Sequence, residues 1–346
     1  MSNKFVEYLK EYKSKCDSFV EGKGAREFLS SFGLDNEMGT YIDALLHHTL
    51  GGKRIRACLV SLGYGLFAGF ERNEDVLLPS LSYEFFQTGI LAHDDIIDNS
   101  DYRRFKPSMH KYLGQGHDGV SKSICVGDFG IVSAIEILQR CDFSDSVKLK
   151  AVSHQNKVFS ATIAGELKDI EFSYADKVSE SEILEMYRLK TAQYTVSGPL
   201  VLGAILAGAD EKSIKLLSDF GDAVGISFQI RDDILGLYGD EAKVGKSITS
   251  DMCEGKKTVL VSHFDTTASD EQRNEFYSVY GRKESGISEL ERVREILIST
   301  CSLEYAENLC KSYVDAATRT LAQININEGG ISLLFGLLEY MTSRNS

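Results

Sequence analysis

The stretch VLLPSLSYEFFQTGILAHDDIID, residues 76–98, indicates which class of fold this chain adopts. Its apolar residues recur about every three to four positions, which is the spacing of one helix face rather than the alternation of a strand. The apolar part ends in charged residues from His93 to Asp98. We therefore expect a buried helix whose last turn carries several carboxylates.

The same helical spacing recurs along the chain. Besides 76–98, it covers residues 37–50, 54–69, 119–140, 147–174, 181–208, 212–238, 286–320 and 329–343. Only 3 prolines occur in 346 residues, and few prolines favour long helices because proline breaks them. No strand–helix alternation is found. The expected fold is all-α: a single domain, residues 1–346, built as a bundle of roughly ten helices or more.

Composition excludes several classes of function. The 38 Lys and Arg residues against 51 Asp and Glu give a net charge of −13, which argues against general binding to nucleic acid or to an anionic membrane. No apolar run reaches the roughly 18 residues of a membrane span, and the N-terminus has no apolar signal region. The 7 cysteines are scattered, without a CxxC pair. These features predict a cytoplasmic protein with reduced thiols and no integral membrane segment.

The charged end of the first helix suits a divalent metal ion. Asp94 and Asp98 lie four residues apart, so they face the same way on a helix, with Asp95 beside them. Close carboxylates repel unless a cation neutralises them, and a hard ion such as Mg²⁺ accepts one or two carboxylates while keeping positions for water and phosphate oxygens. An acidic helix end on a solvated surface is the alternative. The apolar run before it favours a site.

A second helix has the same layout. FQIRDDILG, residues 228–236, is an apolar helix end with the aspartate pair Asp232 and Asp233. Gly236 stands where a third carboxylate would be, so this cluster is the weaker ligand set. We expect the two helix ends to face each other across a cavity and to hold metal ions around a diphosphate.

Basic residues occur at turns and near these acidic ends. The segment GGKRIR, residues 51–56, places cations after two glycines at a helix start, where free N–H groups and the helix dipole favour anions. Further basic residues near the clusters or in a helix between them are Arg103, Arg104, Lys190, Lys246, Lys256 and Lys257. For any one of them, a solvated surface charge is the alternative.

Together these motifs resemble the trans-isoprenyl diphosphate synthases of the polyprenyl synthetase family. The resemblance runs from about residue 45 to 260 and includes GGKRxR at 51–56, DDIIDNSDYRR at 94–104, KT at 190–191, FQIRDD at 228–233 and GK at 245–246. It implies an all-α isoprenoid synthase fold around a central cavity, a homodimer, and dependence on Mg²⁺, with three ions. It further implies that isopentenyl diphosphate is joined head-to-tail to an allylic diphosphate such as geranyl or farnesyl diphosphate, with release of pyrophosphate.

The resemblance also implies roles for single residues. Asp94 and Asp98 are the expected ligands of two metal ions with Asp95 in support, and Asp232 the ligand of the third, helped by Asp233. The residues expected on the allylic diphosphate are Arg103, Lys190, Lys246 and Lys256. Those expected on isopentenyl diphosphate are Lys53, Arg56, Gln87 and Arg104. Thr191 and Gln229 are expected beside the developing allylic cation.

Three positions depart from the family's pattern. Gly236 replaces an aspartate, which we expect to loosen the third metal site without abolishing it. Ala57 replaces a common proline, a change expected to be minor. Phe105 replaces a usual glycine directly after Arg104, which leaves the loop geometry there open.

Product length depends on what lines the path of the growing chain along the helix before Asp94. Gly89 and Ile90 precede the aspartates, and neither is an aromatic plug. Phe85 and Phe86, about one turn deeper, are the next candidate floor, with ordinary core packing as their alternative. We therefore expect geranylgeranyl diphosphate or a somewhat longer all-trans product, and a shorter one after Gly89→Phe.

Two other functions stay open. A class I terpene cyclase shares the fold and the first acidic helix, but its second metal motif carries Asn/Asp, Ser/Thr and Glu, and it needs no second diphosphate site at Lys53 and Arg56. A non-catalytic or regulatory subunit of a heteromeric prenyl synthase typically loses aspartates, whereas both pairs are present here. The sequence therefore favours the synthase.

Overall fold

Helices account for nearly all of the structure. The computed structural model describes residues 3–239 and 248–342, and within them the only strands are β1 (Tyr102–Arg103) and β2 (Lys106–Pro107). This confirms the all-α prediction. The chain divides into two compact units, Met1–Asn156 with Pro199–Asp210 and Lys157–Gly198 with Glu211–Ser346. The single domain expected from the sequence stays a prediction.

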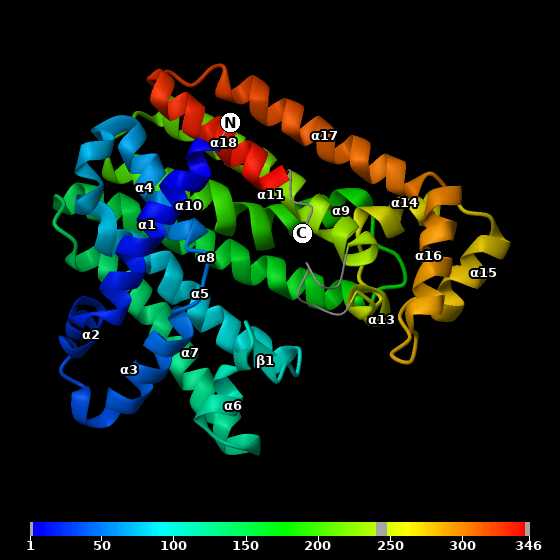
Figure 1. The fold of residues 1–346 in the computed structure, drawn as a ribbon, viewed down its shortest axis with the longest axis horizontal. Helices are drawn as coiled ribbons and strands as arrows, with labels where there is room; N and C mark the ends of the chain where they lie inside the picture. The colour runs from blue at the N-terminus through cyan, green and yellow to red at the C-terminus, as the bar shows by residue number, and fades with distance from the viewer. Residues whose placement is uncertain (1–2, 240–247, 343–346) are drawn as a thin grey trace. The chain divides into compact units, whose positions relative to one another are not determined.

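The first unit contains the N-terminal helices and the first aspartate cluster (Figure 1). In chain order its elements are α1 (Lys4–Glu21), α2 (Lys23–Ser30), α3 (Asp35–Thr49), α4 (Ile55–Ala68), the 3₁₀-helix η1 (Phe70–Val76), α5 (Leu77–Ile97), the β1–β2 hairpin, α6 (Met109–Leu113), α7 (Gly116–Arg140), the start of α8 (Asp145–Ser173) and nearly all of α10 (Gly198–Leu206).

Helix α5, which carries the aspartates, packs closely along α7 because both helices have glycine at the crossing. A methyl group added to Gly89 would lie 2.5 Å from the carbonyl oxygen of Gly127 and 3.1 Å from a side-chain carbon of Ile131. One added to Gly130 would lie 3.1 Å from the carbonyl oxygen of Phe85. A side chain at position 89 would therefore run into the backbone of α7.

The expected shortening of the product by Gly89→Phe stays a prediction, and this contact adds a structural cost to that variant. The variant has to push α7 away from α5, and we expect it to lower the free energy of unfolding by about 3 kcal/mol or more, as overpacked cores do. Urea unfolding measures the loss. Ile90→Phe, at a half-buried neighbouring position, is the better test of product length and should leave stability nearly unchanged. An equal loss in both variants would contradict this account of Gly89.

The β1–β2 hairpin has an unusual turn. Tyr102 pairs with Pro107 and Arg103 with Lys106, so Arg104 and Phe105 alone form the loop. Their φ angles are 53° and 61°, the left-handed values that a two-residue I′ turn requires and that glycine or asparagine usually supplies. Phe105 is 96% exposed. Its backbone strain is therefore not offset by burial of the ring.

Phe105→Gly is expected to raise the free energy of unfolding by about 1 kcal/mol, because glycine adopts a left-handed conformation without steric cost. Phe105→Ala keeps the strain and serves as the matched control. Thermal and urea unfolding of both variants decide the point: a stabilised Ala variant, or a destabilised Gly variant, would show that the ring rather than the backbone determines stability here.

The second unit contains the second aspartate cluster. Besides most of α8, its elements are α9 (Glu180–Tyr187), the π-helical segment η2 (Arg188–Ser197), α11 (Glu211–Tyr238), α13 (Ser250–Glu254), α14 (Val259–Thr267), α15 (Asp270–Val279), α16 (Ile287–Ser299), α17 (Ser302–Leu321) and α18 (Glu328–Thr342). Its hydrophobic core is formed by residues of α8, α9, α11 and the helices that follow, including Ile230, Leu260, Phe264, Phe276 and Leu297.

The π-helical segment lies in the middle of the stretch 181–208, which the sequence predicted as one helix. Three glycines of neighbouring helices make room for it. A methyl group on Gly165 of α8 would lie 2.7 Å from the Cα of Lys190, and methyl groups on Gly221 and Gly225 of α11 would overlap η2 in the same way. Helical periodicity alone does not reveal a π-segment, because its residues stay apolar on the packed side.

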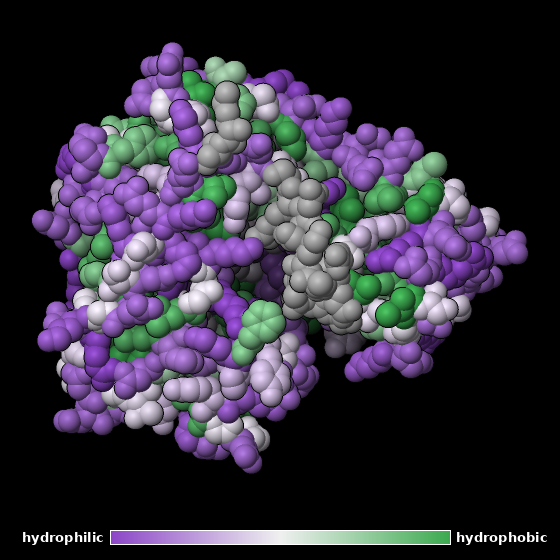
Figure 2. Space-filling model, in the orientation of Figure 1, coloured by the Kyte–Doolittle hydropathy of each residue, from purple (hydrophilic) through white to green (hydrophobic). Residues whose placement is uncertain are grey.

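Most other predicted helices agree with the structure to within a few residues. The exception is 286–320, which divides into α16 and α17 where Cys301 adopts a φ of 56°. All seven cysteines are unpaired. Hydrophilic residues cover much of the face seen in Figure 2, with hydrophobic ones among them in small groups. In the part of the chain that the structure describes, no helix is long and apolar enough to span a membrane.

Candidate active site

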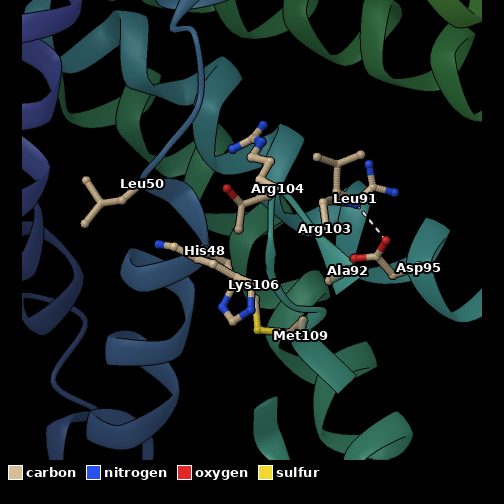
Figure 3. Close-up of a pocket in the computed structure, with 10 residues that line it drawn as sticks. His48, Leu50, Leu91, Ala92, Asp95, Arg103, Arg104, Lys106 and Met109 are labelled. Carbon is tan, nitrogen blue, oxygen red and sulfur yellow. Dashed lines mark hydrogen bonds and ion pairs between the residues drawn. The ribbon is translucent and has the colours of Figure 1, made fainter. Parts of the chain in front are cut away.

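The C-terminal end of α5 separates its three aspartates by exposure. Asp95 is buried, Asp94 is half-buried, and Asp98, which follows the last helical residue, is exposed. Arg103 of β1 binds two of them: its Nε donates to Asp95 Oδ1 at 2.6 Å, and its Nη2 donates to Asp94 Oδ2 at 2.7 Å. The hairpin thus returns an arginine to the acidic helix end, as Figure 3 shows for Asp95.

A single guanidinium, that of Arg103, lies against two of the three carboxylates of this cluster. Burial raises the pKa of the Asp95 carboxyl, while the Arg103 guanidinium acts in the opposite direction. Within residues 3–239 and 248–342, no three His, Cys, Asp or Glu side chains are grouped as a metal site would be. The structure therefore shows the acidic end with an arginine as its counter-ion.

The glycine-rich turn before α4 accommodates an arginine of the hairpin. Gly51 has a φ of 86°, which favours glycine. A methyl group on Gly52 would lie 3.2 Å from Nη1 of Arg104, so the missing side chain leaves room for that guanidinium. Lys53 is exposed and Arg56 is half-buried.

Arg54, between them, has a structural role that the sequence grouping missed. Its side chain is fully buried: Nε donates to Asp17 Oδ1 at 2.8 Å, and Nη1 donates to Glu84 Oε2 at 2.9 Å and to the carbonyl of Thr49 at 2.6 Å. The predicted cluster of three cations therefore has only two members that are accessible to an anion. Glu84, the one charged residue in the apolar run of α5, was the sequence signal for a buried partner.

A pocket lies beside the first cluster (Figure 3). Its lining combines apolar side chains with several basic ones: His48, Leu50, Thr88, Leu91, Ala92, Asp95, Arg103, Arg104, Lys106 and Met109. Burial lowers the pKa of Arg104, and the neighbouring arginines act in the same direction against Glu84. Gln87 is half-buried beside the lining residue Thr88. The basic groups make this pocket suitable for an anion with an apolar part.

The two aspartates of the second cluster, on α11, also differ in exposure to solvent. Asp232 is exposed, whereas Asp233 is buried. Asp233 accepts hydrogen bonds from Lys256 Nζ at 2.9 Å, Gln229 Nε2 at 3.0 Å and the hydroxyl of Tyr187. Burial raises the pKa of Asp233 against the effect of Lys256. Both oxygens of Asp233 thus accept hydrogen bonds inside the protein, and its expected help to Asp232 with a metal ion stays a prediction.

Lys190 and Thr191 are adjacent in η2 but bind different helices. Lys190 Nζ lies 2.9 Å from Glu166 Oε2 and 2.5 Å from Asp169 Oδ2, both on α8, and these carboxylates raise its pKa against the effect of burial. Thr191 Oγ1 donates to Gln229 Oε1 at 2.8 Å. Glu166 and Asp169 were not predicted as partners of Lys190, although their spacing of three residues, which places them on one helix face, was the available signal.

The remaining predicted positions lie as follows. The carboxylate of Asp251 occupies the space where a side chain at position 236 would begin, so Gly236 is the residue that leaves room for it. Phe85 and Phe86 are both buried in the first unit, and Ile90 is half-buried. Lys246 lies outside the described residues.

Comparisons with known proteins agree with these motifs. The profile of the polyprenyl synthetase family matches residues 40–297. The chain belongs to the polyprenyl synthetase family. It is 31% identical to the geranylgeranyl diphosphate synthase of Sulfolobus acidocaldarius over 93% of this chain and 92% of that protein. It is 30% identical to the geranylfarnesyl diphosphate synthase of Aeropyrum pernix over 85% of this chain and 91% of that protein.

The fold of this family member matches solved structures of the same kind. The geranylgeranyl pyrophosphate synthase of Corynebacterium glutamicum, crystallised with isoprenyl diphosphate and magnesium, superposes with a TM-score of 0.85 at 28% identity and covers 98% of this chain and 99% of that chain. Membership confirms the sequence-based identification as a trans-isoprenyl diphosphate synthase, and with it the prediction of a prenyltransferase. The roles of the single site residues stay predictions.

Proposed function

We propose that this polyprenyl synthetase condenses isopentenyl diphosphate head-to-tail with an allylic diphosphate, geranyl or farnesyl diphosphate, and releases pyrophosphate. The observation that carries the proposal is the arginine pair of the hairpin. Arg103 binds the acidic end of α5, and Arg104 reaches the glycine turn that precedes Arg56. One short hairpin thus supplies a cation beside each of the two predicted diphosphate sites.

The predicted metal ligands fit Mg²⁺. Asp94, Asp98 and Asp232 offer only carboxylate oxygens, and two of the three are exposed. Mg²⁺ binds through one or two carboxylates and completes its shell with water and phosphate oxygens, so a preformed protein cage is not needed. We assign three ions to these residues. When bound, they supply positive charge that stabilises the pyrophosphate as it leaves.

The chain's own residues bind the two substrates. The residues assigned to the allylic diphosphate are Arg103, Lys190, Lys246 and Lys256. Those assigned to isopentenyl diphosphate are Lys53, Arg56, Gln87 and Arg104. Since negative charge grows on the leaving oxygens in the transition state, cations fixed there stabilise it more than the ground state.

The reaction breaks the C1–O bond of the allylic diphosphate and leaves an allylic cation. The oxygen dipoles of Thr191 and Gln229 are assigned to stabilise it, and apolar helix faces exclude the water that would capture it. The double bond of isopentenyl diphosphate then forms the new C–C bond. The proton lost afterwards passes to the released pyrophosphate, so no side-chain base is required.

The product is assigned as geranylgeranyl diphosphate or a somewhat longer all-trans polyprenyl diphosphate, in line with the products named for the relatives. Phe85 and Phe86 stay the candidate floor of the chain path. Ile90→Phe is the substitution that tests the path without moving α7. Cytoplasmic location, expected from the sequence, is part of the same proposal.

A homodimer completes the proposal. Large apolar side chains are exposed on two long helices: Ile124 and Val132 on α7, and Leu149, Ile163 and Leu167 on α8. Such residues are common at the contacts of homodimers, whose interfaces are more apolar than the remaining surface. Sedimentation analysis of the purified protein decides between monomer and dimer.

One assay tests the proposed reaction. Purified protein is incubated with Mg²⁺, labelled isopentenyl diphosphate and farnesyl diphosphate, and the products are separated by chromatography. An elongated diphosphate together with pyrophosphate is the expected result. A hydrocarbon or alcohol formed from farnesyl diphosphate alone would instead indicate a terpene cyclase, and no reaction without a second protein would indicate a subunit of a heteromeric synthase.

A further inference from the structure

A buried tyrosine outside the sequence motifs contacts the second aspartate cluster. Tyr187, the last residue of α9, is 1% exposed, and its hydroxyl donates to Asp233 Oδ2. The same hydroxyl accepts a hydrogen bond from the backbone N–H of Val259 at 3.3 Å. Three elements therefore meet at this hydroxyl: α9, α11 and the start of α14.

The other oxygen of Asp233 receives two groups assigned to the reaction. Lys256 Nζ and Gln229 Nε2 both donate to Oδ1, at 2.9 and 3.0 Å. With Tyr187 on Oδ2, the carboxylate is held from both sides and has no solvent exposure. A rotation of this carboxylate would break all these bonds, so its orientation determines where the ammonium and the amide lie.

Two hydrogen bonds of this network also fix the orientation of the Gln229 side-chain amide. Its NH₂ group is bound to Asp233, and its oxygen accepts a hydrogen bond from Thr191 Oγ1 at 2.8 Å. The negative end of the amide dipole therefore lies at the Thr191 side. An amide turned the other way would place N–H groups there, and these would destabilise a nearby carbocation.

We propose that Tyr187 is a positioning residue of the prenyl transfer: it fixes Asp233, and Asp233 in turn fixes the Lys256 ammonium and the direction of the Gln229 amide. The inference rests on the proposed function, since it needs Lys256 to act on the allylic diphosphate. It goes beyond that function by giving Asp233 an internal role and by adding a residue that touches no substrate. Replacing Tyr187 should therefore weaken binding of the allylic diphosphate and not of isopentenyl diphosphate, because the groups assigned to isopentenyl diphosphate belong to the first unit.

Tyr187→Phe removes only the hydroxyl, and Tyr64→Phe is a matched control. Tyr64 of α4 is 2% exposed and its hydroxyl likewise donates to a carboxylate, Oδ2 of the exposed Asp75, at 3.0 Å. For both variants we would measure kcat, the KM of each substrate, and the Mg²⁺-dependent binding of inorganic pyrophosphate by calorimetry.

For Tyr187→Phe, the KM of farnesyl diphosphate and the Kd of pyrophosphate should rise about tenfold, in keeping with a lost hydrogen bond to a charged group. The KM of isopentenyl diphosphate should change less than about twofold. The kcat should also fall, because Asp233 no longer holds the Gln229 amide in one orientation. For Tyr64→Phe, all these constants should equal those of the wild type. If Tyr187→Phe does not fold, Asp233→Asn, which keeps the shape of the side chain, is measured with the same expectation.

The two proposals fail separately. A wild-type protein that binds pyrophosphate with Mg²⁺ but forms no prenyl product would contradict the proposed function. An active wild type whose Tyr187→Phe variant keeps the KM of farnesyl diphosphate and the Kd of pyrophosphate would contradict the positioning role. Equal changes in Tyr187→Phe and Tyr64→Phe would also contradict it, since they would show a general effect of losing a hydrogen bond from a tyrosine hydroxyl to a carboxylate.

Discussion

Asp98→Asn is expected to lower kcat about a thousandfold, because it removes one carboxylate charge from the predicted magnesium ligands and so weakens the stabilisation of the leaving pyrophosphate. The side chain is exposed at the end of α5, so the fold should be kept. Steady-state kinetics over a range of Mg²⁺ concentrations should show a higher Mg²⁺ requirement as well as a lower kcat.

Asp101→Asn is the control for this prediction. Asp101 is also exposed, lies three residues further along the chain, and forms an ion pair with Lys111 at 2.9 Å. The variant should retain kcat to within about twofold, since exposed ion pairs contribute little. An Asp98→Asn variant with the activity and the Mg²⁺ requirement of Asp101→Asn would remove Asp98 from the metal site.

Arg54→Met is expected to lower the free energy of unfolding by about 3–5 kcal/mol, because it leaves the buried Glu84 carboxylate without its counter-charge. The carbonyl of Thr49 and the Oδ1 of Asp17 lose their arginine donors at the same time, while Lys13 still binds the Oδ2 of Asp17. Urea unfolding followed by circular dichroism measures the loss. Arg54→Met combined with Glu84→Gln should recover part of it, since the buried charge is then absent.

Arg56→Met, two residues further along the chain, should affect substrate binding and not stability. Its guanidinium is assigned to isopentenyl diphosphate, so the variant should keep its stability to within about 1 kcal/mol while the KM of that substrate rises about tenfold. If Arg54→Met keeps full stability, or if both variants lose stability equally, the division of the basic turn into a structural and a binding arginine is wrong.

The helices were the most predictable part of the fold. Long apolar periodicities with few prolines gave α5, α8 and α11 almost to their ends, since such helices are formed by local spacing. The π-segment and the break at Cys301 were not predicted. Both depend on how neighbouring elements pack, as at Gly165, and the residues concerned keep a helical pattern.

The candidate site was predictable where charge follows an apolar run. Asp94, Asp98 and Asp232 were found in this way, and the structure shows them half-buried or exposed. Asp94 and Asp98 lie at the end of α5, whereas α11 continues from Asp232 to Tyr238, beyond the helix end that the sequence predicted. What a single sequence cannot show is the partner of each charge. Arg54 was grouped with binding cations because its partner Glu84 lies 30 residues away in the sequence.

Two more partners were hidden for the same reason. Tyr187 and Lys256 both bind Asp233, across 46 and 23 residues of sequence. The role of Phe105 was equally unpredictable, because the hairpin is too short to show strand alternation. Its left-handed backbone depends on the pairing of Arg103 with Lys106.

In the proposed reaction both aspartate motifs hold the magnesium ions of one diphosphate. A crystal structure of the protein soaked with Mg²⁺ and inorganic pyrophosphate tests this arrangement. We expect Asp94, Asp98 and Asp232 all to bind metal ions that share a single pyrophosphate, with Arg103 and Lys190 on its oxygens. Metal ions on Asp94 and Asp98 alone, or a pyrophosphate bound away from both helix ends, would contradict it.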